Sequence, residues 1–120
     1  MSGGAGNDFF YLRSGDRALG GDGNDKFFAT TGGGNLLSGG AGADQFWIFG
    51  AEAPASANTI LDFQNGTDVI GLIGSGATFA QLTRSGNTIS LNGKTLAIFT
   101  GVDTTSLTAT SFAFSATQPV

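Results

Sequence analysis

One nine-residue phrase occurs three times, nearly unchanged, within the first 47 residues of the chain. The copies begin at Gly3, Gly20 and Gly39, and each has glycine at its first, second and fourth positions, aspartate at its sixth and phenylalanine at its eighth. Glycine adopts backbone angles that other residues rarely reach, so each phrase predicts a tight turn whose carbonyl oxygens point inward. The phenylalanine predicts the inward-facing residue of a short strand that follows each turn.

Two degraded copies alternate with the three clear ones. Residues 12–19 keep Gly15 and Asp16 but lack one residue, and residues 30–38 have Asn35 where the aspartate belongs. If two phrases make one repeat, alternate phrases lie on the same flank and stack one strand spacing apart, about 4.8 Å. We therefore expect clear copies on one flank and degraded copies on the other.

The clear copies place three aspartates, Asp8, Asp25 and Asp44, in one expected column. Hard oxygen ligands without any histidine or cysteine are what calcium selects. Three stacked turns then make two calcium sites, with Asp25 shared by both. The other flank, with Asp16 out of register and Asn35 uncharged, is expected to bind weakly or not at all.

The candidate ligands follow from the positions of the glycines and aspartates in the phrase. The predicted metal ligands are Gly4, Gly6, Asp8, Gly21, Gly23, Asp25, Gly40, Gly42 and Asp44, and further candidates are Asp22, Asn35, Asp62 and Asp68.

The alternative interpretation of the glycine-rich first half is a flexible linker. Ordering so many glycines is costly and stacked aspartates repel, so that alternative describes the calcium-free chain, and folding and ion binding are expected to be one event.

The phrase resembles the glycine-rich, calcium-binding nonapeptide of the RTX (repeats-in-toxin) family. The resemblance continues into residues 60–70 and 96–103, which are similar to segments that follow the repeats in serralysin-type C-terminal regions. It implies an all-β fold, a calcium-binding parallel β-roll (β-solenoid) over residues 1–56 that continues into a β-rich C-terminal cap over residues 57–120. It also implies secretion to the cell exterior, with the C-terminal region read by the type I secretion machinery.

The second half of the chain changes from glycine phrases to alternating apolar and polar residues, which predicts strands. Asn92-Gly93 is a strong hairpin signal, and Ala77 to Leu82 is the only plausible helical turn. The expected strands are 59–63, 68–72, 88–91, 94–99 and 111–114.

The sequence between the glycine phrases and the second half has two features, and each of them allows two interpretations. Residues 50–58 are either a degraded copy with Asn58 in the aspartate place or a loop. Asp62 and Asp68 either contribute to a further calcium site or are ordinary turn and strand-end aspartates.

Composition restricts the function classes. The net charge of −4 argues against nucleic acid and anionic membrane surfaces, and no stretch is apolar and long enough to cross a bilayer. The chain has no histidine or cysteine and a single glutamate, so no enzymatic activity is expected.

These features predict a secreted, extracellular calcium-binding structural protein that folds on binding calcium. The first copy begins at Gly3, which leaves the first turn uncapped. We therefore expect self-association at this end, with head-to-tail filaments as one outcome. One alternative is a C-terminal calcium-binding and secretion module of a longer enzyme or adhesin. Another is a carbohydrate-binding module, which requires Tyr11 and Trp47 to be exposed in a groove.

Overall fold

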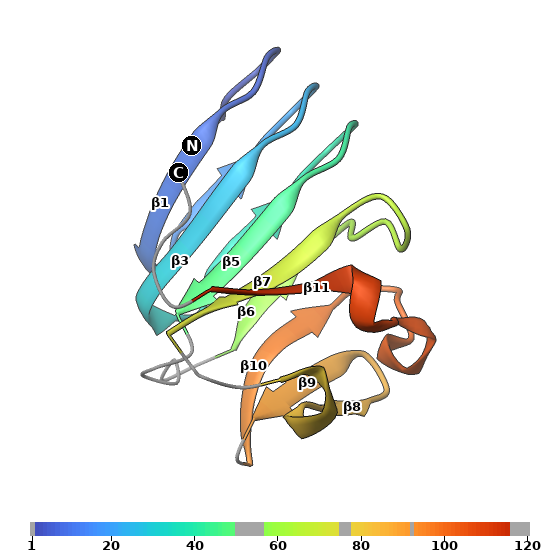
Figure 1. Cartoon of the computed structure of the whole chain (residues 1–120). Coiled ribbons are helices and arrows are strands. Elements are labelled where there is room, and N and C mark those ends of the chain that lie inside the picture. Colours follow the sequence, from blue (N-terminus) through green and yellow to red (C-terminus); the bar gives the residue numbers. More distant parts are fainter. Residues whose placement is uncertain (1, 50–56, 75–77, 92, 116–120) are drawn as a thin grey trace.

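The computed structural model describes residues 2–49, 57–74, 78–91 and 93–115, which form two facing β-sheets (Figure 1). The five-stranded sheet contains, in spatial order, β1 (Phe9–Ser14), β3 (Lys26–Gly33), β5 (Gln45–Phe49), β7 (Val69–Ile73) and β11 (Phe112–Ser115). The six-stranded sheet contains β2 (Arg17–Leu19), β4 (Leu36–Ser38), β6 (Asn58–Ile60), β10 (Lys94–Phe99), β9 (Thr88–Leu91) and β8 (Thr83–Ser85).

The helices in these ranges are short 3₁₀ turns, and none of them has the length and apolar character needed to cross a membrane. They are η1 (Phe79–Gln81), η2 (Thr104–Ser106) and η3 (Ala109–Ser111).

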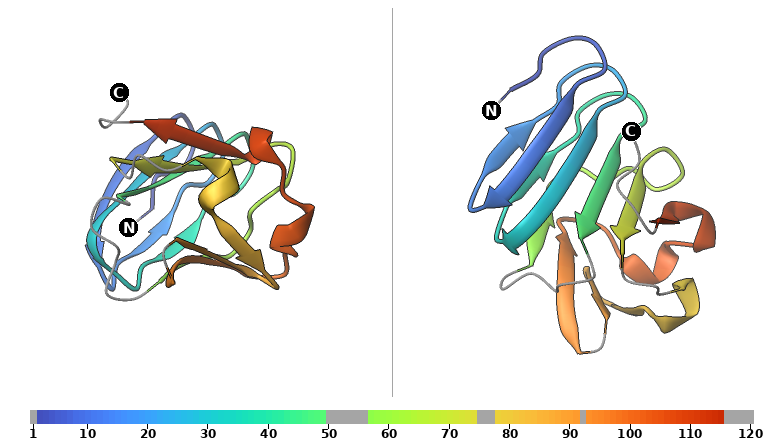
Figure 2. Two further views of the ribbon diagram at one scale, coloured as in Figure 1. Left: turned by 60° about the horizontal axis from the view of Figure 1, so that its bottom comes forward. Right: turned by 60° about the vertical axis from the view of Figure 1, so that its left-hand side comes forward.

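Successive strands alternate between the sheets through β7, so each glycine phrase turns the chain from the six-stranded sheet to the five-stranded one. Every pairing in the five-stranded sheet is parallel. The six-stranded sheet is mixed, because β9 pairs antiparallel with both β8 and β10, while β10 pairs parallel with β6. Figure 2 shows the turns before β1, β3 and β5 stacked along one edge.

The core lies between the sheets and is built on a row of aromatic rings. Phe10, Phe27 and Phe46 are register partners on β1, β3 and β5. Their rings stack with centroids 4.9 Å apart in both pairs, and the next partner in the row is Ile70 of β7. The eighth position of the phrase is therefore an inward-facing strand residue, as predicted.

The predicted fold class is correct in being all-β but wrong in being a parallel β-roll (β-solenoid) over residues 1–56 that continues into a β-rich cap. The described residues form a compact globule with a radius of gyration of 12.7 Å and extents of 36 × 27 × 23 Å. Strands from the second half of the chain enter both sheets, and one of the sheets is mixed. The physical reason is that a single apolar cluster runs from Phe10 to Phe112, so the two halves bury their inward faces against each other.

Most of the elements expected in the second half are present within a residue or two. The hairpin over β9 and β10 has the predicted bounds, and Gly93 in its turn has a φ of 78°. The strand expected over 59–63 is shorter, ending at Ile60, and β8 was not predicted at all. Two interpretations were open for residues 50–58. Residues 50–56 lie outside the described residues, and Asn58 begins β6, where its Oδ1 accepts from the N–H of Asn35 as an aspartate of the phrase would.

Replacing Phe27 with alanine tests the ring stack. Phe27 is fully buried between two rings, so Phe27→Ala should lower the free energy of unfolding by about 3–5 kcal/mol, measured by urea denaturation. Phe9→Ala, on the half-exposed outer face of β1, is the matched control and should cost about 1 kcal/mol or less. Equal losses for the two variants would contradict the assignment of the core.

Candidate metal site

The three glycine phrases form turns of the same backbone shape, stacked directly on one another. The glycines at the second and fourth positions of every copy have positive φ values, between 78° and 108°. They are Gly4, Gly6, Gly21, Gly23, Gly40 and Gly42. A Cβ on Gly21 would lie 2.4 Å from the carbonyl oxygen of Gly4, and one on Gly40 would lie 2.3 Å from that of Gly21. Both the left-handed backbone and the close approach therefore require glycine in the second and third turns.

The sixth residue of each phrase forms a column of carboxylates along these turns. The backbone N–H of Asp8 donates to Oδ1 of Asp25 at 2.8 Å, and that of Asp25 donates to Oδ1 of Asp44 at 2.9 Å. A third step follows, from the N–H of Asp44 to Oδ1 of Asp68 at 2.9 Å. We call Asp8, Asp25, Asp44 and Asp68 the carboxylate column; its first three members were predicted to stack, and they do.

The second oxygen of the first three carboxylates is left without a partner. Oδ2 of Asp8, Asp25 and Asp44 is buried and makes no hydrogen bond to the described residues. Asp25 and Asp44 are 0% and 1% exposed, so water does not compensate these charges from the surface. An ionised carboxylate oxygen buried in this way is unfavourable by several kcal/mol unless a positive charge or a proton accompanies it.

The column resists ionisation in the absence of a counter-ion. Burial raises the pKa of Asp44 to about 7, opposed by the N–H of Asp25 and reinforced by the charges of Asp68 and Asp25. Burial also raises the pKa of Asp25, with a further upward contribution from the charge of Asp8. A bound cation would oppose these upward pKa shifts, since it favours the ionised form.

The ligand set available to a cation combines carboxylates with backbone oxygens. No three acidic, histidine or cysteine side chains converge on one point within the described ranges. The carbonyl oxygens of Gly4 and Gly21 lie against the next turn, and a Cβ on Gly20 would lie 2.4 Å from Oδ2 of Asp25 and 2.7 Å from the carbonyl oxygen of Gly39. The residues present thus fit a hard cation bound between adjacent turns by carboxylate and carbonyl oxygens.

Asp62 and Asp68, the further candidates at the junction, differ from the other aspartates because both oxygens of each already accept hydrogen bonds. Asp62 accepts from the N–H groups of Gly39 and Gly40 at 2.8 and 2.9 Å, and from the Ser38 hydroxyl. Oδ2 of Asp68 accepts from the N–H of Gln64 at 2.8 Å. These two side chains close the end of the stack, and burial raises the pKa of Asp68.

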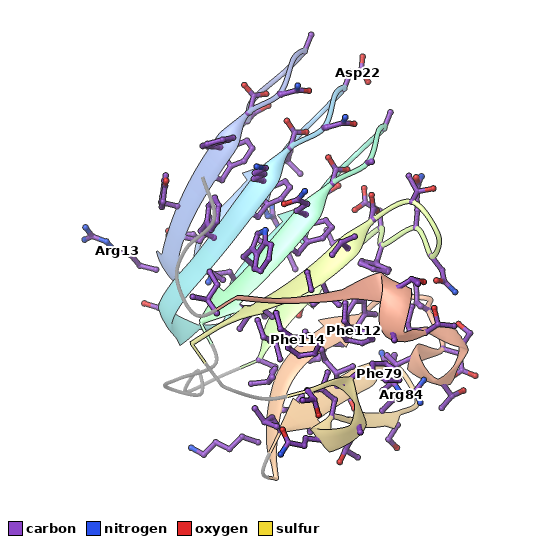
Figure 3. The ribbon with its side chains drawn as sticks, viewed as in Figure 1. Arg13, Asp22, Phe79, Arg84, Phe112 and Phe114 are labelled. Carbon is purple, nitrogen blue, oxygen red and sulfur yellow. The ribbon has the colours of Figure 1, made fainter. Side chains whose placement is uncertain are left out.

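The two remaining candidates lie away from the unpartnered oxygens. Asp22 is exposed at the tip of its turn and points outward (Figure 3). Asn35 is buried on the opposite flank, where its Oδ1 accepts from the N–H of Asp16 at 2.8 Å. The expectation that Asp16 is out of register is therefore wrong: between Leu12 and Ser14 the pairing of β1 with β3 is irregular, and this irregularity absorbs a two-residue difference in length.

Sequence reasoning missed a second ladder beside the carboxylate column. The N–H of Asn24 donates to Oδ1 of Asn7, and the N–H of Ala43 donates to Oδ1 of Asn24, both at 2.8 Å. The signal was present in the fifth position of the phrase, which is asparagine in the first two copies. These exposed amides hold adjacent turns together without contributing charge.

The aromatic residues considered for sugar binding are not exposed together. Trp47 is 6% exposed, donates its indole N–H to Oε1 of Gln45, and its ring occupies the space above Gly71. Tyr11 is 53% exposed at the edge strand and stacks on Phe28. The groove with two exposed rings that this alternative requires is not formed by these residues.

Comparisons with known proteins add no relative to this picture. No family model matches the chain, and neither the search of curated proteins nor the search of solved structures found a match.

Alanine at the second glycine of the phrase separates backbone strain from crowding. Gly4→Ala meets only open space and should lower the free energy of unfolding by about 1–3 kcal/mol, because its φ is positive. Gly21→Ala has a similar φ but also collides with the carbonyl of Gly4, so it should cost about 1–3 kcal/mol more in the same urea titration. Equal losses would mean that the turns are not stacked as described.

The metal-stripped protein should become more stable on acidification. The folded-state pKa of Asp44 lies near 7, above the ordinary value of 3.8, so this group's stabilising contribution is complete below about pH 4 and is lost as pH rises through 7. Urea unfolding between pH 4 and 8 should show a slope of up to about 1.4 kcal/mol per pH unit for each such carboxyl. Asp44→Asn should flatten this slope, and stability that rises from pH 4 to 7 would contradict the account.

Proposed function

We propose that this chain is a calcium-binding module whose folding is completed by the ion, bound between adjacent turns of the carboxylate column. The observation that carries the proposal is the set of unpartnered, buried Oδ2 atoms of Asp8, Asp25 and Asp44. They recur at one position of a repeated turn, so a single isolated defect does not account for them.

Calcium is favoured over other metals by the chemistry of the available ligands. The chain has no histidine and no cysteine, which disfavours zinc and copper. Calcium accepts six to eight oxygen ligands in flexible geometry and takes backbone carbonyls readily, whereas magnesium keeps several waters and demands a near-ideal octahedron. A site made of two carboxylates and turn carbonyls suits the former ion.

Binding and folding are coupled because the site exists only when the turns are stacked. The ligand oxygens come from two adjacent turns that are distant in sequence, so the unfolded chain has no equivalent site. Calcium at a hundred times its dissociation constant would stabilise the folded state by about 2.7 kcal/mol for each site. Extracellular calcium modules work at about 10⁻⁴–10⁻³ M, so the proposal includes secretion and folding outside the cell.

The module's role in this proposal is structural. The two sheets end together at β1 and β2, where Phe9 and Leu19 are 50% and 45% exposed. An edge strand flanked by exposed apolar side chains favours association with another copy, which gives an extracellular scaffold or filament. The alternative role, as the calcium-binding part of a longer secreted protein, uses the same metal site.

A calcium titration of matched variants tests the proposal. Asp25→Asn keeps the Oδ1 acceptor of the ladder but removes the carboxylate charge that two calcium sites, one on each side of this turn, would share. It should weaken calcium binding at least about tenfold, as measured by titration calorimetry. Asp22→Asn, at the exposed tip of the same turn, is the control and should bind as the parent does.

Circular dichroism and light scattering should accompany the titration. Stripped protein is expected to lose part of its β-structure and to regain it on adding calcium. Growth of scattering with calcium supports self-association at the β1 and β2 edge, and a stable monomer favours a module of a longer protein. Equal calcium affinity in the Asp25 and Asp22 variants, or no calcium response, would overturn the proposed site.

A further inference from the structure

The flank opposite the carboxylate column carries a ladder of the same geometry made with amides. Asp16 and Asn35 immediately precede β2 and β4, and Asn58 is the first residue of β6. The N–H of Asp16 donates to Oδ1 of Asn35 at 2.8 Å, and the N–H of Asn35 donates to Oδ1 of Asn58 at 3.2 Å. We call these three residues the amide column.

The two asparagines of the amide column differ from the aspartates of the carboxylate column at one side-chain atom. Where Asp25 and Asp44 bury an unpartnered Oδ2, Asn35 has Nδ2, which donates to Oδ1 of Asn58 at 2.8 Å and to the carbonyl of Arg13 at 3.1 Å. The identity of these atoms follows from the ladder, because the backbone N–H of Asp16 needs an acceptor and so faces the amide oxygen.

The amide column is also uncharged where it is buried. Asn35 and Asn58 are almost completely buried and carry no charge that requires compensation. The one carboxylate, Asp16, lies at the outer end, and its Oδ2 accepts from the N–H of Arg13 at 2.9 Å. Nδ2 of Asn58 is the atom of this column that has no partner among the described residues.

We infer that the amide column is a cation-independent seam, which keeps β2, β4 and β6 paired when the carboxylate column has lost its cation. Calcium removal would then open the molecule from one flank, where carboxylates repel, while the other flank stays closed. This inference rests on the proposed calcium function and specifies which part of the fold the ion controls.

Backbone hydrogen bonds at equivalent places on the two flanks provide the probes. On the carboxylate flank, Lys26 and Gln45 donate to the carbonyls of Asp8 and Asp25, both at 2.9 Å. On the amide flank, Leu36 and Thr59 donate to the carbonyls of Asp16 and Asn35, both at 2.8 Å.

Hydrogen exchange measured by NMR, on the whole chain with calcium and with chelator, tests the inference. Calcium removal should lower the protection of Lys26 and Gln45 at least about tenfold more than that of Leu36 and Thr59. Equal loss at the four amides, or greater loss on the amide flank, would overturn the inference while leaving calcium-coupled folding intact. No change at any of the four would overturn the proposed function, and the inference with it.

A single substitution tests the role of the amide donor. Asn35→Asp keeps the oxygen that accepts the ladder hydrogen bond but replaces the donating Nδ2 with a second oxygen. That oxygen would face two acceptor oxygens, the carbonyl of Arg13 and Oδ1 of Asn58. In chelator, this variant should lose about tenfold or more protection at Leu36 and Thr59. Asn7→Asp makes the same change at an exposed ladder residue and should leave both amides unaffected.

Unchanged protection of the Leu36 and Thr59 backbone amides in the Asn35 variant would show that the side-chain amide of Asn35 does not hold this flank together. If the variant does not fold, the comparison of the two flanks in the parent chain decides the matter alone.

Discussion

The hydrogen bond from a backbone N–H to the side-chain oxygen of the next turn is the interaction on which this structure depends. It recurs from Asp8 to Asp25 to Asp44 to Asp68 on one flank, and from Asp16 to Asn35 to Asn58 on the other. Each bond fixes the register of the strand that follows, so the rings of Phe10, Phe27 and Phe46 meet inside. A slip of one residue would turn these rings to the outside.

The same bond leaves buried carboxylates that need either a cation or a proton. A ladder of this kind uses one oxygen of each side chain and leaves the other atom to find its own partner. In Asn35 that atom is a donor and finds carbonyl and amide oxygens, whereas in Asp25 and Asp44 it is an acceptor facing no donor. The choice between aspartate and asparagine at one position thus decides whether a flank needs a positive charge.

Local sequence features predicted the parts of the structure that depend on short-range chemistry. The spacing of the phrases predicted the column of Asp8, Asp25 and Asp44, and Asn92-Gly93 predicted the hairpin of β9 and β10. The alternation of clear and degraded copies predicted two unlike flanks, although Asp16 proved to be in register. Whether the column binds calcium stays a prediction.

The overall architecture could not be predicted in the same way, because it depends on contacts between distant segments. β6 pairs with β10, and β7 with β11, across about forty residues of chain, and no phrase in the sequence marks these partners. The prediction of a β-solenoid that continues into a cap was wrong for this reason. Similarly, the partners of Asp62 and Asp68 are turn amides, which carry no side-chain signature in the sequence.

The most direct test of the calcium account is a crystal structure of the chain grown with calcium. The account predicts ions between the first three turns, 2.3–2.6 Å from Oδ2 of Asp8, Asp25 or Asp44 and from turn carbonyl oxygens. A structure in which these oxygens instead share protons or bind water, with calcium present in the crystal, would contradict it.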